Sequence, residues 1–173
     1  MKTKKRTLKK EEKKESETEY VIRAENVDYT YEGSKIKALD HLSLNIRKGK
    51  KVAVMGGNGC GKSTFFLCLN GIRRPESGRI FIDGKPIEYT KKGLLDVRRK
   101  VGIVFQNPDE QLFSASVYEE ISFGILNMGA DEETAEKAVR QIIEELGLSA
   151  FQEEPTHALS GGQKKQVAIA DIL

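Results

Sequence analysis

The segment that most constrains this chain is a glycine-rich run at residues 56–63, which reads Gly-Gly-Asn-Gly-Cys-Gly-Lys-Ser. It matches the pattern GxxxxGK[ST] and lies between an apolar run and a stretch with helical character. Glycines let the backbone curl so that successive N–H groups face one anion, and the helix that follows adds its positive N-terminal end. The pattern therefore predicts a loop that cradles phosphates.

The residue types in this loop predict separate roles. Lys62 is expected to reach the β- and γ-phosphates of a nucleotide, and the Ser63 hydroxyl to bind Mg²⁺. The alternative is a chance glycine-rich turn, which the strand before it and the helix after it disfavour. Cys60 is interpreted as a small loop residue, because a redox role has no second feature in its support. The predicted nucleotide contacts are Gly56, Gly57, Asn58, Gly59, Cys60, Gly61, Lys62, Ser63 and Thr64.

Charge separates the first 19 residues from the rest. Residues 1–19 hold eight basic and five acidic side chains, which accounts for the net charge of +3 and leaves residues 20–173 neutral. A neutral domain argues against a nucleic-acid partner. We expect the tail to be solvated and disordered, with contact to anionic lipid headgroups as the alternative. Two cysteines are too few for a disulfide framework and favour a reduced setting.

Hydrophobic patterns predict strands in the first half of the chain and helices in the second. Alternating or β-branched runs predict strands at residues 20–31, 42–46 and 79–82. Short apolar runs at 51–55 and 101–105 are expected to be buried central strands of a parallel sheet. Helical spacing of apolar residues predicts helices at 63–71, 117–126 and 131–146, and a last one from Ser160. This order indicates a mixed α/β core with a helical subdomain at 107–160.

A second motif, Leu-Ser-Gly-Gly-Gln at residues 159–163, begins the last predicted helix. A serine N-cap followed by two glycines can approach an anion closely, although alone it indicates only an ordinary cap. Together with the phosphate loop, the motif resembles the signature sequence of ABC ATPases. The resemblance implies a contact with ATP held by a second subunit, in a homo- or heterodimer. The residues implied are Leu159, Ser160, Gly161, Gly162 and Gln163.

Two further positions fit the resemblance. Gln106 resembles the family's Q-loop glutamine, which implies contact with Mg²⁺ and the attacking water and coupling to a membrane partner. Tyr31 resembles the aromatic residue that stacks on adenine, with Tyr29 as the competing candidate. The alternatives are a surface glutamine and an ordinary strand aromatic. The implied ligands are ATP and Mg²⁺, the metal being held by Ser63 and Gln106.

The sequence FQNPDEQLFSASV at residues 105–117, followed by EEISFG at 119–124, is similar to that of the energy-coupling-factor importers. Its QLFSASV part resembles their cobalt-import ATP-binding subunits. The resemblance implies a peripheral subunit on the cytoplasmic face of the membrane, serving an importer for cobalt, with nickel or a vitamin as alternatives. Integral membrane subunits are the implied partners. Leu112 and Phe113 are expected either in their docking groove or in the core of the helical subdomain.

The sequence also lacks parts that the family's chemistry needs. The Walker B aspartate and glutamate, the D-loop and the switch histidine should follow the signature helix, within which this sequence ends. Asp83, His41 and His157 all precede the signature, so none of them substitutes. Gln166 stands where the family usually has arginine, and Asp171 where a small residue is usual.

We therefore expect an ABC-type nucleotide-binding domain that lacks the C-terminal part of its core. Such a chain would leave residues 51–55 and 101–105 without neighbouring strands and would not hydrolyse ATP alone, although its family consists of ATPases. The alternatives are a truncated, non-catalytic ATP-binding fragment and an ABC protein that works outside transport.

Overall fold

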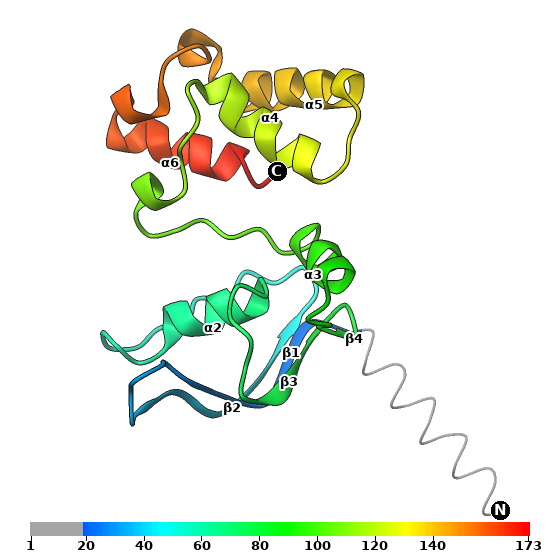
Figure 1. Ribbon diagram of the computed structural model, residues 1–173, viewed down its shortest axis with the longest axis vertical. Helices are drawn as coiled ribbons and strands as arrows, with labels where there is room; N and C mark the ends of the chain where they lie inside the picture. Colours follow the sequence, from blue (N-terminus) through cyan, green and yellow to red (C-terminus); the bar gives the residue numbers. More distant parts are fainter. Residues whose placement is uncertain (1–18) are drawn as a thin grey trace, which may run out of the picture. The chain divides into compact units, whose positions relative to one another are not determined.

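The structure, a computed structural model, describes residues 19–173 and divides into two compact units between Val101 and Gly102 (Figure 1). Apart from Glu19, the predicted tail lies outside the described residues. The Glu19 carboxylate is 3.1 Å from Nε of Arg47. The predicted helical subdomain at 107–160 falls inside the second unit, and its limits stay a prediction. Within residues 19–173, no helix combines the length and apolar character needed to cross a membrane.

An antiparallel sheet with the strand order β2-β1-β3-β4 forms the base of the first unit. β1 lies between β2 and β3 and pairs with β2 from Tyr20↔Arg47 to Thr30↔Lys37. The strands predicted at residues 20–31, 42–46 and 79–82 are confirmed. The strands are β1 (Tyr20–Thr30), β2 (Lys37–Arg47), β3 (Ser77–Ile82) and β4 (Lys85–Pro86).

Helix α2 (Lys62–Leu69) is anchored to this sheet by its apolar face. Phe65, Cys68 and Leu69 are buried in one cluster with Val27 and Ile80 of the strands. Burying Phe65 and Leu69 contributes about 1.5–3 kcal/mol each. Burial also raises the pKa of the Cys68 thiol to about 11, so this cysteine is a neutral core residue. The first turn of α2 is thereby held in a fixed place at the end of the glycine-rich loop.

The sequence patterns did not indicate helix α3 (Lys91–Arg98), which follows β4. The Thr90 hydroxyl accepts a hydrogen bond from Gly93 N at 3.1 Å and caps the helix. Gly93, a poor helix former, is required because a Cβ there would lie 2.4 Å from the Glu88 carbonyl oxygen. The close approach of the backbone at Glu88, rather than helix propensity, explains why glycine occupies position 93.

Residues 51–55 and 101–105 do not form the predicted central strands, and that prediction is wrong for the described chain. Both segments lack strand pairing, and Val52 and Met55 are 55% and 89% exposed. A strand exists only where a neighbour pairs with its backbone N–H and C=O groups, and residues 19–173 supply none to these segments. The expected lack of neighbours is thus confirmed.

The second unit consists of helices around a separate apolar core. Val117, Ile121, Val139, Leu148 and Val167 are among its most buried members. The helices predicted at 117–126 and 131–146 are confirmed, as is a helix opened by Ser160. The elements are η1 (Pro108–Glu110), α4 (Val117–Asn127), α5 (Glu132–Glu145), η2 (Ser149–Phe151), η3 (Thr156–Ala158) and α6 (Gly161–Ala170).

Candidate functional site

The glycine-rich loop ends at a helix N-terminus that offers its N–H groups to a ligand. Gly61 is the N-cap of α2 and makes no side-chain cap, and the first turn holds no acidic residue. The other α-helices of residues 19–173 have side-chain caps from Thr90, Ser116, Asp131 and Ser160. Uncapped N–H groups and the positive end of the helix dipole together favour an anion at this position.

Lys62 places a positive charge at the centre of the loop. Its Nζ donates hydrogen bonds of 2.8 Å to the carbonyl oxygens of both Gly56 and Gly57 and lies 3.6 Å from Sγ of Cys60. Atoms of the loop therefore contact the ammonium group of Lys62 from several residues. Ser63, beside it, is exposed, which leaves its hydroxyl accessible.

Three contacts hold the Tyr31 side chain, one of them to the first turn of α2. Its hydroxyl forms a 3.0 Å hydrogen bond with the hydroxyl of buried Thr64. Its ring meets Tyr29 edge-on at 5.1 Å, and the Arg73 guanidinium lies 5.6 Å from its centroid. Tyr31 is 39% exposed whereas Tyr29 is 9% exposed, so only Tyr31 of the two candidates offers a ring surface to a ligand. Sequence reasoning missed Arg73, because no motif marks it.

The signature motif opens α6 with a complete capping box. The Ser160 hydroxyl accepts from Gln163 N at 3.3 Å, and Gln163 Oε1 accepts from Ser160 N at 2.8 Å. Leu159 is buried in the core of the second unit. Gly161 and Gly162 are exposed, and a Cβ on either would meet no atom within 4 Å. The capping box fixes the N-terminus of α6, and the two exposed glycines leave room there for another group to approach.

The predicted site residues fall into two groups, each described within its own unit. Tyr31 and residues 56–64 belong to the first unit, where the hydrogen bond from Tyr31 to Thr64 joins them. Gln106 and residues 159–163 belong to the second unit. Gln106 is exposed and lies two residues before η1, whose N-cap is Asn107.

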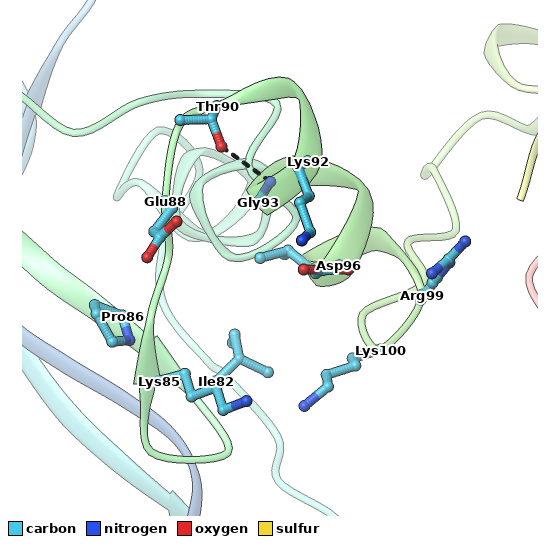
Figure 2. Close-up of a pocket in the computed structure, with 11 residues that line it drawn as sticks. Ile82, Lys85, Pro86, Glu88, Thr90, Lys92, Gly93, Asp96, Arg99 and Lys100 are labelled. Carbon is cyan, nitrogen blue, oxygen red and sulfur yellow. Dashed lines mark hydrogen bonds between the residues drawn. The ribbon is translucent and has the colours of Figure 1, made fainter.

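A cavity of about 640 Å³ lies elsewhere in the first unit, between β4 and α3, and contains none of the predicted site residues. Figure 2 shows Lys85, Lys92 and Lys100 around it together with the carboxylates of Glu88 and Asp96. Lys100 also pairs with Asp83 at 2.8 Å. With Arg99, four cationic side chains and two carboxylates line this cavity.

Asp28, Asp40 and His41 form a group of possible metal ligands among the described residues, at the sheet rather than at the predicted Mg²⁺ position. Lys37 Nζ already donates to both carboxylates, at 3.1 and 2.9 Å. Asp28 also accepts from His41 N and from Ser77 Oγ, at 2.7 Å each, and the His41 hydrogen bond contributes most to holding its pKa well below the usual value. Hydrogen bonds to Asp28 therefore link β1 to both β2 and β3.

Comparison with known proteins gives consistent matches. A family model described as ABC transporter matches residues 39–173. An energy-coupling factor transporter ATP-binding protein of Clostridium perfringens is 47% identical over 155 residues, covering 90% of this chain and 54% of that protein. The structure of cbiO1 from Clostridium perfringens, described as part of the ABC transporter complex cbiONQ, has a TM-score of 0.76 at 47% identity, over 90% of this chain and 61% of that one.

A second solved structure adds a bound ligand to the comparison. It is a dimeric ATP-binding cassette in a post-hydrolysis state bound to ADP and Pi, with a TM-score of 0.77 at 28% identity, over 88% of this chain and 68% of that one. The chain spans a little over half the length of the curated relatives it matches, 55% and 54% for the first two.

Proposed function

Because this chain belongs to the ABC transporter family, we propose that it is the ATP-binding part of the energy-coupling subunit of an importer. The observation that carries the proposal is the loop at residues 56–63, with Lys62 at its centre and the uncapped N-terminus of α2 behind it. Backbone N–H groups and the lysine bind the phosphates, and Tyr31 stacks on adenine. The Ser63 hydroxyl binds Mg²⁺ beside the phosphates.

Hydrolysis belongs to an assembled subunit that also provides a Walker B glutamate and a switch histidine. Residues 1–173 do not contain these two groups after the signature motif. We propose that residues 56–64 contribute the ATP-binding loop to that subunit. One alternative is a non-catalytic ATP-binding fragment. The neutral charge of residues 20–173 disfavours the other alternative, an ABC protein that works on nucleic acid.

An exposed aromatic pair on the second unit supports a membrane partner. Phe113 and Phe123 are 66% and 50% exposed, and their rings meet edge-on at 5.0 Å. Leu126, three residues after Phe123, is exposed as well. Leu112 instead packs on the helical core. Exposed apolar clusters of this kind mark interfaces. We assign Phe113 to the docking surface for an integral membrane subunit, which places the chain peripherally on the cytoplasmic face. The membrane subunits select the cargo. We propose cobalt, with nickel or a vitamin as alternatives, from the resemblance of residues 111–117 to cobalt-import ATP-binding subunits.

The exposed glycines at the start of α6 support a second ATP contact, made to a nucleotide held by a partner subunit. Replacing Ser160 by arginine fills this open surface, so Ser160→Arg is expected to leave the ATP affinity of one chain within about twofold while abolishing dimer closure in Mg–ATP. Closure is measured by light scattering of the protein with and without nucleotide.

Ser116→Arg is the matched control, because Ser116 caps α4 through Glu119 N just as Ser160 caps α6 through Gln163 N. It loses the same kind of cap, a change of about 1 kcal/mol, without touching the signature. Normal closure of Ser160→Arg, or equal loss in both variants, would remove the proposed role of the signature.

A further inference from the structure

The segment between α2 and β3, residues 70–76, holds the end of β1, which Tyr31 follows directly. Glu76 accepts two hydrogen bonds of 3.2 Å from Thr30, one from the backbone N–H and one from the hydroxyl. The Glu76 N–H in turn donates to the carbonyl oxygen of Asp28 at 2.9 Å. The carboxylate and the backbone of Glu76 both bind β1, so this segment and the end of the strand are joined.

Arg73, in the same segment, is placed against the ring of Tyr31. Its backbone N–H donates to the carbonyl oxygen of Leu67 in α2 at 3.0 Å, which ties the residue to the end of that helix. The guanidinium lies 5.6 Å from the ring centroid, within the range of a cation–π contact. The Tyr31 hydroxyl meets Thr64, in the first turn of the same helix, at 3.0 Å. Groups at both ends of α2 therefore hold this one side chain.

A ring that is held in advance is a better surface for a ligand that stacks on it. An aromatic side chain that is free to rotate must be ordered when a base binds, and ordering a side chain at a binding surface lowers affinity. Tyr31 keeps 39% of its surface exposed with these contacts in place, so a planar group can still reach it. Because the Arg73 cation favours one position of the ring, part of the ordering is complete before the ligand arrives.

We propose that Arg73 is a positioning residue for the base of the nucleotide, which acts through the Tyr31 ring and leaves phosphate binding unaffected. This inference rests on the proposed function, in which Tyr31 stacks on adenine and residues 56–64 hold the phosphates. All of these groups belong to the first unit. Binding of a nucleotide therefore depends on Arg73, whereas binding of a phosphate chain without a base does not.

The test compares the affinities of the chain for ATP and for tripolyphosphate, each with Mg²⁺, by isothermal titration calorimetry. Arg73→Gln is expected to weaken ATP binding about threefold, because a cation–π contact at an exposed site corresponds to a factor of about two to five. Its affinity for tripolyphosphate should stay within about 1.5-fold of wild type. Tripolyphosphate carries the phosphate charge without a base, so equal weakening for both ligands would indicate general attraction between opposite charges and overturn the proposal.

Arg74→Gln is the matched control for the loss of one positive charge. Arg74 is the next residue, is also exposed, and lies over a different ring, that of Tyr89, at 5.3 Å. Its replacement should leave the affinity for ATP within about 1.5-fold of wild type. Equal losses of ATP affinity in Arg73→Gln and Arg74→Gln would overturn the proposal.

A double-mutant cycle establishes whether Arg73 acts through the ring. Tyr31→Leu keeps an apolar side chain and removes the aromatic ring, and in that background Arg73→Gln is expected to have no further effect on ATP affinity. In a Tyr31→Phe background, which keeps the ring and loses the hydroxyl, the effect of about threefold is expected to persist. An undiminished Arg73 effect in Tyr31→Leu, or no effect in Tyr31→Phe, would contradict action through the ring.

The same titrations separate this inference from the proposed function on which it rests. If wild type binds ATP and Arg73→Gln binds it equally well, the role of Arg73 is wrong and the proposed function stands. If wild type binds neither ATP nor tripolyphosphate, both are wrong.

Discussion

Lys62→Ala is expected to lower the affinity of the chain for Mg–ATP about 100-fold. The Lys62 ammonium lies inside the loop, 2.8 Å from the carbonyl oxygens of Gly56 and Gly57. On binding, it is expected to exchange these neutral partners for phosphate oxygens. A hydrogen bond to a charged group contributes about 1.5–3 kcal/mol, which corresponds to a 10- to 150-fold change in affinity. Isothermal titration calorimetry with Mg–ATP measures the loss.

Lys51→Ala is the control for this loss, because it removes the same charge from an exposed lysine a few residues before the loop. Screening by solvent and salt makes such a surface charge a weak contributor, so its affinity for Mg–ATP should stay within about twofold of wild type. Equal weakening in both variants would indicate general attraction between opposite charges. Unchanged affinity in Lys62→Ala would refute the assignment of the loop.

Gly61→Ala is expected to destabilise the first unit by about 3 kcal/mol or more, through strain and a backbone clash. Gly61 has φ +90°, a conformation that side chains disfavour, and a Cβ there would lie within 2.2 Å of the Ala38 carbonyl oxygen. Ala38 belongs to β2, so the obstructing atom is backbone and cannot swing aside. The free energy of unfolding is measured by denaturant titration followed by circular dichroism.

Gly59→Ala separates the effect of backbone strain from the effect of the clash with β2. Gly59 also has positive φ, +78°, but a Cβ on it would meet no atom within 4 Å. Only backbone strain of about 1–2 kcal/mol is expected there. Equal destabilisation by the two substitutions would mean that the close passage of β2 is not what requires glycine at position 61.

The elements that sequence reasoning predicted are those with local signals. The helix at 131–146 has a long apolar stripe and an aspartate cap, and the structure gives α5 with Asp131 as its N-cap. The start of α2 follows from the glycine-rich loop. In these places local propensity and tertiary packing favour the same structure.

The features that could not be predicted depend on contacts distant in sequence. α3 contains Gly93 because of a neighbouring loop, and residues 51–55 read as a strand whose pairing partner is not among the described residues. The choice between Tyr29 and Tyr31 required knowing which ring is buried. Arg73 looked like one exposed cation among many, because the ring that it contacts, that of Tyr31, is distant in the sequence.

The most direct test of phosphate binding by residues 56–63 is to follow backbone amide resonances of the chain by NMR while Mg–ATP or tripolyphosphate is added. Both ligands are predicted to shift the amides of residues 57–64, and ATP alone to shift Tyr31 as well. Tripolyphosphate tests the loop without the base. Shifts confined to residues 85–100, around the lysine-lined cavity, or no shifts at all, would contradict a phosphate-binding loop.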